Sequence, residues 1–373
     1  MTARNPLADP RPGDLLRITR RMRAQADGCD AGRVPGAVRG LEAGGRGEGV
    51  ANMSIAHVVS VSGGKDSTAT LLLALERFGR GRVVPILCDT GNEHQAVYDY
   101  LGHLEAALGV RIRRLRADFS AEFARKRAFI ARDQRAGRDD RGRRLRWSNR
   151  RKREALAVLH PTGNPFLDLC LLKGRFPSRA AQFCTERLKR DPAVEFQLAL
   201  IDAGYHVVSW QGIRRDESQR RRNALRFERL APRLDVYRPI VDWTAQQVFE
   251  FCASRGIRPN PLYLQGMGRV GCMPCINAGK AEIAEIARRF PEHIERIAAW
   301  ERLVSGASKR GASTFFHKVE RPGTSREQFE ANRVESIIEW ARTTRGGRQF
   351  DLLEALAPSA GCASSYGLCE VVA

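Results

Sequence analysis

The sequence predicts an α/β fold with a doubly wound, mostly parallel sheet and a helical C-terminal region. Residues 55–61 and 82–88 are short apolar runs of strand length, and residues 67–78 and 95–108 carry apolar side chains at helical spacing. Because strands and helices alternate, successive strands are expected to lie parallel in one sheet. The same patterns predict further strands at 110–115 and 205–210, and helices at 195–203, 281–290, 292–303 and 326–345.

An edge strand is expected at 237–243, where Pro239 cannot donate a hydrogen bond to a neighbouring strand. A helix should follow it, beginning at a capping box formed by Thr244 and Gln247 and ending near Gly256. Cys252 lies on this helix between phenylalanines and is expected to pack in the core.

Three regions are expected along the chain. Residues 1–52 are rich in Gly, Arg, Ala, Asp and Pro and poor in large apolar side chains, which is typical of a disordered extension. Residues 53–260 would form the main α/β domain, with a basic insertion near 121–153. Residues 261–373 would form a cysteine site and the helical region.

The formal net charge of +21 favours a polyanionic partner such as nucleic acid. A coding bias towards arginine is the alternative, and it would spread the charge instead of clustering it. The densest run is 138–153, where Trp147 stands among arginines. This run is either a solvated surface or a groove in which the ring stacks on bases.

The cysteine content and the lack of export signals bear on the compartment. No segment has the length and apolarity of a membrane span, and the first residues do not resemble a signal peptide. Nine cysteines in such a chain favour metal binding or catalysis over a disulfide framework. The expectation is a cytoplasmic protein with no membrane association.

The central motif lies between the first expected strand and the first expected helix. Glycines at this position let backbone N–H groups approach a ligand, and the N-terminus of the helix adds partial positive charge, so a phosphate group is the expected ligand. The spacing differs from the Gly-x4-Gly-Lys-Ser/Thr loop of kinases and GTPases. The candidate phosphate-binding residues are Ser62, Gly63, Gly64, Lys65, Asp66 and Ser67.

Two further loops follow expected strands and should face the same ligand, because a doubly wound sheet binds ligands at the carboxyl ends of its strands. The first is Asp89-Thr90-Gly91. The second runs from Gly212 to Arg220, and in it Arg214 and Arg220 would present guanidinium groups to phosphate or sulfate oxygens. A surface cluster of ion pairs with Asp216 and Glu217 is the alternative for these arginines.

Cys272-Met-Pro-Cys275 has the spacing at which two thiolates bind one metal. On its own this spacing is weak evidence. It follows Asn260-Pro-Leu-Tyr263 and an Arg-Val-Gly segment at 269–271.

Together, these motifs resemble the phosphoadenosine phosphosulfate (PAPS) reductase family of the adenine nucleotide alpha-hydrolase-like superfamily. The resemblance covers about residues 55–280. It implies that the loop around Lys65 is a PP-loop that binds the pyrophosphate of ATP, or PAPS, and that Asp89 and its neighbours surround the adenosine. Cleavage of ATP between the alpha and beta phosphates is the usual reaction, with Mg²⁺ as cofactor and Lys65 and Asp66 as catalytic residues.

The resemblance also implies a cysteine-ligated cluster. Cys184, Cys272 and Cys275 match three of the four ligands of iron–sulfur members, although Phe183 stands where these members carry a second cysteine beside Cys184. The fourth ligand is left open between Cys362 and Cys369, which are favoured, and Cys170. A [4Fe–4S] cluster is expected first, structural zinc second and inert buried thiols third.

Three functions remain in competition. One is sulfur transfer to, or modification of, nucleic acid, similar to the PAPS-reductase-like component of DNA phosphorothioation systems, with a sulfur donor such as a cysteine desulfurase as a further partner. Another is a sulfonucleotide reductase that releases sulfite. The chain lacks the Glu-Cys-Gly-Leu-His motif of that group and offers only Cys369 as attacking thiol. The third is a non-catalytic nucleotide or redox sensor.

Overall fold

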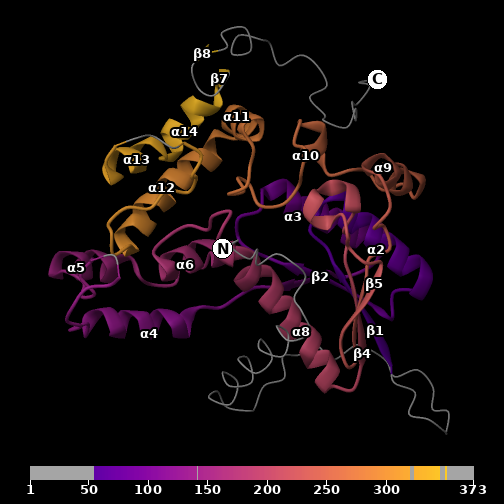
Figure 1. Cartoon of the computed structure of the whole chain (residues 1–373). Helices are drawn as coiled ribbons and strands as arrows, with labels where there is room; N and C mark the ends of the chain where they lie inside the picture. Colours follow the sequence, from indigo (N-terminus) through magenta and orange to yellow (C-terminus); the bar gives the residue numbers. More distant parts are fainter. Residues whose placement is uncertain (1–53, 141, 320–322, 345–348, 351–373) are drawn as a thin grey trace.

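The computed structural model describes residues 54–140, 142–319, 323–344 and 349–350 (Figure 1). The predictions for the extension at 1–52 and for Cys362 and Cys369 therefore concern residues outside this part of the chain. Among the described residues, no helix combines the length and the apolarity that crossing a lipid bilayer requires.

A six-stranded sheet forms the centre of the α/β part, in the order β3-β2-β1-β4-β6-β5. Neighbouring strands are parallel except for β5, which runs antiparallel to β6, so the predicted doubly wound, mostly parallel sheet is confirmed. The strand order reverses between β1 and β4, and ligands of such sheets bind at this switch point. The strands are β1 (Ile55–Ser60), β2 (Val83–Cys88), β3 (Arg113–Leu115), β4 (His206–Trp210), β5 (Phe227–Ala231) and β6 (Leu234–Tyr237).

Helices cover both faces of this sheet, because successive side chains of a strand point to opposite sides. The covering helices are α2 (Lys65–Phe78), α3 (Gln95–Leu108), α8 (Asp191–Asp202) and α9 (Ala245–Ser254). In β1, Val59 packs in a core that includes residues of α2, α3 and α9. Its neighbour Val58 packs in a second core with Leu200 of α8.

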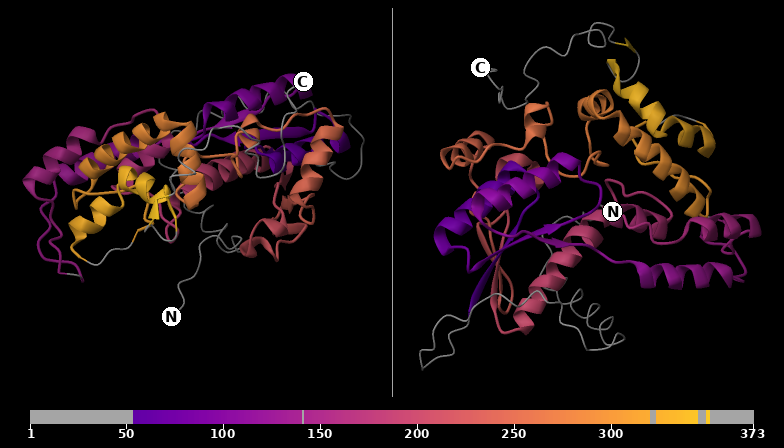
Figure 2. Two further views of the ribbon diagram at one scale, coloured as in Figure 1. Left: turned by 90° about the horizontal axis from the view of Figure 1, so that it is seen from above. Right: turned by 180° about the vertical axis from the view of Figure 1, so that it is seen from behind.

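A helical part lies beside the sheet and takes its helices from two stretches of the chain (Figures 1 and 2). It contains α4 (Ser120–Ala131), α5 (Asn149–Val158), α6 (Pro165–Lys173), α11 (Lys280–Arg289), α12 (Pro291–Ala307), α13 (Ser325–Ala331) and α14 (Val334–Ala341). Helix α12 packs against both α5 and α6, and Phe166, Trp300 and Ile337 share one core. The predicted helical C-terminal region is therefore present and is buried partly against helices of the earlier insertion.

The remaining elements are short. They are α7 (Phe183–Thr185), a π-helical turn (Glu186–Arg190) that continues into α8, two 3-10 turns (Arg215–Glu217 and Gln219–Arg221), α10 (Pro261–Leu264), and the paired strands β7 (Thr343–Thr344) and β8 (Gln349–Phe350).

Two predicted elements are shorter than expected. The strand predicted at 110–115 begins only at Arg113, because the backbone N–H of Ile112 is bonded to the Glu105 carboxylate (2.7 Å). The helix predicted at 326–345 is divided into α13 and α14. Asn332 lies between them, where its side-chain oxygen accepts hydrogen bonds from the backbone N–H groups of Lys318 and Val319.

The prediction of an edge strand at 237–243 is wrong. Strand β6 ends at Tyr237 and lies inside the sheet, and the edge is occupied by β5. Glu228 and Arg229 of β5 are charged, which suits an exposed edge but hides the strand from a search for apolar runs. The helix expected next is confirmed as α9, with Thr244 and Gln247 forming the capping box, and Cys252 is buried as expected.

Of the two interpretations of the run around Trp147, the one in which this ring stacks on bases is wrong. Only 7 % of its surface is exposed, and its ring packs in the core of the helical part. Its backbone N–H donates to the buried carboxylate of Asp133 (2.8 Å), which fixes this loop against the helices. An aromatic residue within a charged run can thus be the side chain that packs the run against the hydrophobic core.

Candidate functional site

The loop after β1 is held in a tight conformation by its own side chains. The Ser67 hydroxyl accepts a hydrogen bond from the backbone N–H of Ser62 (3.1 Å) and donates to the carbonyl of Gly64 (2.9 Å). Gly63 has a φ of +74°, a conformation that favours glycine. Helix α2 then begins at Lys65, so its N-terminus points at the switch point of the sheet, where an anion would be stabilised.

Two residues from the far end of the α/β part hold this loop from outside. The Tyr263 hydroxyl accepts a hydrogen bond from the backbone N–H of Lys65 (3.1 Å), and the Asn260 side chain donates to the carbonyl of Gly63 (3.2 Å). Both residues are buried. Sequence reasoning noted the Asn260–Tyr263 segment only as context. The Asn260-Pro261 pair, which is typical of the start of a helix, is the sequence feature that indicates a structural role for this segment.

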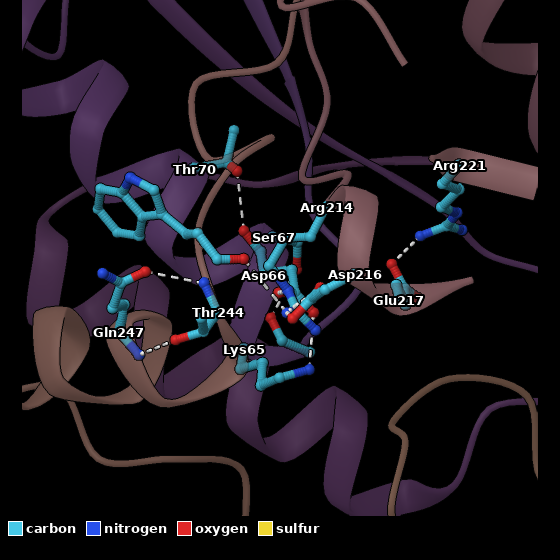
Figure 3. A network of polar contacts seen from close by, with 12 residues as sticks. Lys65, Asp66, Ser67, Thr70, Arg214, Asp216, Glu217, Arg221, Thr244 and Gln247 are labelled. Atoms are coloured by element: carbon cyan, nitrogen blue, oxygen red, sulfur yellow. Dashed lines mark hydrogen bonds and ion pairs between the residues drawn. The ribbon is translucent and has the colours of Figure 1, made fainter. Parts of the chain in front are cut away.

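A chain of ion pairs joins the loop to the segment after β4 (Figure 3). The Lys65 ammonium contacts Asp66 (2.8 Å), Asp66 accepts from Arg214 Nε (2.5 Å), and Arg214 Nη1 contacts Asp216 (2.6 Å). Burial lowers the pKa of Arg214, but Asp66 and Asp216 outweigh this effect and raise it, so the guanidinium stays charged. Arg214 is therefore a buried side chain held by two carboxylates, one of which is Asp66 of the PP-loop. This differs from the surface cluster with Asp216 and Glu217 that was the alternative. The role of Arg214 towards phosphate stays a prediction.

Gly212 and Arg220 differ in how close they lie to this chain. A Cβ atom on Gly212 would come within 2.7 Å of the backbone C and O atoms of Asp66, so the two segments touch through their backbones. Arg220 is exposed on a 3-10 turn, and its neighbour Arg221 pairs with Glu217.

The loop after β2 is a second compact polar segment at the same edge of the sheet. Asp89 is buried and accepts hydrogen bonds from the Gly91 N–H (2.9 Å) and the Tyr98 hydroxyl (2.7 Å). Thr90 donates to the Glu93 carboxylate (2.8 Å). The predicted residues Asp89, Thr90 and Gly91 are thus fixed in place, and Glu93 is an additional acidic group that sequence reasoning did not single out.

The Cys-x2-Cys segment is hydrogen-bonded to this second loop. The backbones of Cys272 and Glu93 pair in an isolated antiparallel β-bridge. Cys272 Sγ lies 3.6 Å from Thr90 Oγ1 and 3.7 Å from the Glu93 carboxylate. The backbone N–H of Met273 donates to the carbonyl of Asn92 (2.8 Å). Arg296 of α12 also connects the two segments, since its Nη2 donates both to the Asn92 side chain (3.0 Å) and to the Met273 carbonyl (2.7 Å). The thiols therefore lie at the carboxyl end of the sheet.

Two of the three expected cysteine ligands, Cys184 and Cys275, pack against the same core, and Cys272 lies near enough to Cys184 to affect its pKa. Burial, and then the neighbouring Cys272, raise the pKa of Cys184 to about 11, and Cys275 adds to the effect. Of the three candidates for a fourth ligand, only Cys170 lies in the described residues. It is fully buried, and burial and the nearby Cys184 raise its pKa. A fourth thiol, that of Cys170, therefore lies near Cys184.

Comparison with protein families gives one extended match. The model of the phosphoadenosine phosphosulfate reductase domain matches residues 56–278, which include all three polar loops and the cysteine segment. The chain belongs to the PAPS reductase family. That assignment covers the sheet, the insertion and the cysteine segment, and leaves α11 to α14 outside the matched range.

Relatives of this PAPS reductase family protein include one that aligns with most of the chain. An uncharacterised 37.8 kDa protein from the gpa 5′ region of Escherichia phage 186 is 45 % identical over 331 residues, or 85 % of this chain and 97 % of the phage protein. An adenosine 5′-phosphosulfate reductase of Neisseria meningitidis is 37 % identical over 71 residues, which is 19 % of this chain and 29 % of that enzyme.

Among solved structures, a PAPS reductase of Candida auris in complex with phosphate aligns over 72 % of this chain and 90 % of its own. The identity is 16 % and the TM-score is 0.34, so the fold assignment is based on the strand order and not on this superposition.

Two cations of the PAPS reductase family protein flank its thiols. Cys272 raises the pKa of Lys189, with a further contribution from Glu93, although burial opposes the shift. Burial lowers the pKa of Arg269, but Cys275 and Glu282 outweigh it. Both side chains keep contact with solvent. A group of partly buried thiols beside two cations suits a metal centre whose thiolate ligands give it negative charge.

The distances between the thiols bear on whether such a metal centre is a zinc site or a larger cluster. Four thiolates around zinc at about 2.3 Å lie about 3.8 Å apart in a tetrahedron. In the described part of the chain, Cys184, Cys272 and Cys275 do not form a set with all sulfur atoms within 4.8 Å of one another. At least two of these sulfur atoms therefore lie farther apart than the thiolates of a closed zinc site.

A second group with metal-ligand chemistry comprises His94, Glu292 and His293, whose ligand atoms lie within 4.8 Å of one another. Both imidazoles already have partners. His94 Nδ1 caps α3 by accepting from the Ala96 N–H (3.0 Å), and His293 Nδ1 lies 3.0 Å from the Met273 carbonyl. Burial, followed by the cation of Arg296, lowers the pKa of His293 to about 4. The Arg296 guanidinium lies 2.9 Å from His293 Nδ1 and disfavours a divalent metal there, and His293 instead contacts the cysteine segment at the Met273 carbonyl.

Proposed function

We propose that this PAPS reductase family enzyme binds ATP on its PP-loop and adenylates an oxygen atom of nucleic acid. The oxygen would attack the alpha phosphate, pyrophosphate would leave, and a sulfur nucleophile would then displace AMP from the adenylated polymer. One observation carries the proposal. The cysteine segment is bonded directly to the Asp89–Glu93 loop, which lies next to the PP-loop at the switch point of the sheet. Nucleotide activation and sulfur chemistry would then occur side by side.

The residues of the PP-loop would divide the work on the phosphates. Backbone N–H groups at the start of α2 would bind phosphate oxygens, and Lys65 would neutralise charge as pyrophosphate leaves. Lys65 now contacts Asp66, so phosphate would take over as its partner. Asp66 would remain paired with Arg214 and could also contact Mg²⁺, which prefers carboxylate and phosphate oxygens. The adenylate would thus form where three charged groups are already positioned.

Cys184, Cys272 and Cys275 would hold a [4Fe–4S] cluster, with Cys170, Cys362 or Cys369 as the fourth ligand. Such a cluster supplies electrons or sulfide when it is bound. Lys189 and Arg269 would offset its negative charge. Zinc is the alternative, and the wide spacing of the thiols disfavours it. A cysteine desulfurase is the kind of partner that would supply sulfur, and the cytoplasm is the compartment in which we expect the reaction.

A second candidate is a sulfonucleotide reductase that releases sulfite. The match to the Neisseria adenosine 5′-phosphosulfate reductase favours it. In that case, Cys369 would attack the sulfur of the bound sulfonucleotide. A non-catalytic nucleotide or redox sensor is the third outcome to be tested.

Anaerobic purification followed by incubation with ATP or PAPS, with and without nucleic acid, separates these functions. The proposal predicts AMP and pyrophosphate from ATP, with stimulation by nucleic acid, and loss of both products in Lys65→Met. Sulfite and adenosine bisphosphate from PAPS would establish the reductase instead, and intact nucleotide in every mixture would favour the sensor. Iron and sulfide measured in the same preparation distinguish the cluster from zinc.

A further inference from the structure

We infer that Phe227 and the arginines around it form a platform for single-stranded nucleic acid beside the nucleotide site. The inference rests on the proposed function, because it names the surface that would hold the polymer. It also replaces the sequence-based expectation that the run around Trp147 provides the stacking ring.

The direction of β5 places Phe227 at the functional edge of the sheet. The other five strands are parallel, so their carboxyl ends meet at the edge that carries the PP-loop. Strand β5 is antiparallel, and its first residue therefore lies at that same edge. The pairing shows this directly, since Val59, Trp210, Tyr237 and Phe227 are successive partners across four strands. Three strand spacings put Phe227 about 14 Å from the end of β1.

Phe227 and its neighbour Leu225 are exposed where apolar side chains are usually covered. The exposed fractions are 54 % for Phe227 and 58 % for Leu225. An exposed ring can stack on a base whatever its identity, since every base has a π-face, and this contact is typical of proteins that bind single strands.

The surroundings of the ring carry excess positive charge. Residues 211–243 contain nine arginines and five carboxylates. All five carboxylates are paired in the structure: Asp216 with Arg214, Glu217 with Arg221, Glu228 with Arg238, Asp235 with Arg229, and Asp242 with both Arg215 and Arg226. Arg220 and Arg222 are exposed on the loop that leads to β5. Permanent charges of this kind bind phosphates without reading sequence.

Two alternatives, another occupant of this surface and another stacking ring, are less compatible with the structure. A second copy of the chain could add a strand to β5, but the alternating Glu228 and Arg229 of the edge disfavour such pairing. The basic insertion offers Phe129 of α4 as an exposed ring, with an exposed fraction of 49 % and the Arg135 guanidinium 4.8 Å from its centre. Phe129 belongs to the helical part and not to the edge of the sheet that carries the PP-loop, and so it provides a matched control.

The test measures binding of a fluorescein-labelled oligothymidylate of about 20 nucleotides, longer than typical single-strand sites, by anisotropy at several salt concentrations. Phe227→Ala should weaken binding about 5-fold or more without changing the salt dependence, and Phe227→Trp should restore it. Arg220→Gln with Arg222→Gln should lower the slope of log K against log salt by about 1.4, from about 0.7 for each phosphate contact. Phe129→Ala should bind as the wild type does.

ATP binding is measured in parallel without the oligonucleotide, so that the platform and the proposed function can fail separately. Loss of oligonucleotide binding in Phe129→Ala but not in Phe227→Ala would overturn the inference. So would a wild type that binds ATP and no oligonucleotide, or light scattering that shows a dimer which Phe227→Ala dissociates while oligonucleotide binding is kept. A wild type that binds oligonucleotide through Phe227 but binds no ATP would keep the platform and refute the proposed function.

Discussion

Replacing Gly212 by alanine tests whether the contact between the β4 loop and the PP-loop positions the site. The added Cβ would lie 2.7 Å from the C and O atoms of Asp66 and 3.0 Å from the backbone N of Ser67, all of them backbone atoms that cannot rotate away. Ordinary carbon contacts begin near about 3.5 Å, so the two segments would have to separate by about 0.8 Å. Overpacking of this size typically costs about 1–3 kcal/mol.

The same displacement should also weaken nucleotide binding. It would stretch the ion pair between Arg214 and Asp66, which is 2.5 Å long, and tilt the first turn of α2 away from the switch point. We expect Gly212→Ala to lower the free energy of unfolding by about 1–3 kcal/mol in a urea titration and to raise the Kd for ATP in calorimetry.

Gly102 is the matched control for this substitution. It lies within α3, where an added Cβ would meet nothing within 4 Å, so Gly102→Ala should stabilise the protein by about 0.5–1 kcal/mol with ATP affinity unchanged. The reasoning would be refuted by a Gly212→Ala protein that matches the wild type in both stability and ATP affinity.

Three further changes test separate parts of the structure. Tyr263→Phe leaves the buried N–H of Lys65 without its partner and should cost about 1–3 kcal/mol in a urea titration, whereas an unchanged midpoint would show that the hydroxyl does not hold the loop. Cys170→Ser should lower the iron content of anaerobically purified protein, while Cys252→Ser, a buried cysteine on α9, should not; equal iron in both would remove Cys170 from the cluster. Burial raises the pKa of Glu301 to about 7. The folded state therefore holds this proton more tightly than the unfolded state, and stability should fall by up to about 3 kcal/mol as pH rises from about 4.5 to 7. Glu301→Gln should flatten that part of the pH profile, and a profile identical to that of the wild type would exclude Glu301 as its source.

Local patterns were sufficient for β1, β2, β4 and the loops that follow them. An apolar run, a glycine turn and an amphipathic helix define β1, the PP-loop and α2 with neighbouring residues alone. The three polar loops could be placed at one edge for a general reason, because parallel strands end on the same side. The same approach failed for β5, whose charged sequence has no apolar run, and for the residues after Tyr237.

Side-chain environment could not be inferred in this way. Trp147 and Phe227 both stand among arginines in the sequence, yet one is 7 % exposed and the other 54 %. The difference arises because α4, α5 and α12 close around the first residue, whereas the edge position of β5 leaves the second uncovered.

The sequence alone determined that this protein has a doubly wound sheet with a phosphate-type loop and a Cys-x2-Cys segment of the PAPS reductase family, since each of these is encoded within a few consecutive residues. Only the tertiary structure decided that Cys170 lies beside Cys184, that Asn260 and Tyr263 brace the PP-loop, and that Arg214 is held by Asp66. These contacts join residues that are between 14 and 198 positions apart, and so they depend on how the helices and strands pack and not on any local pattern.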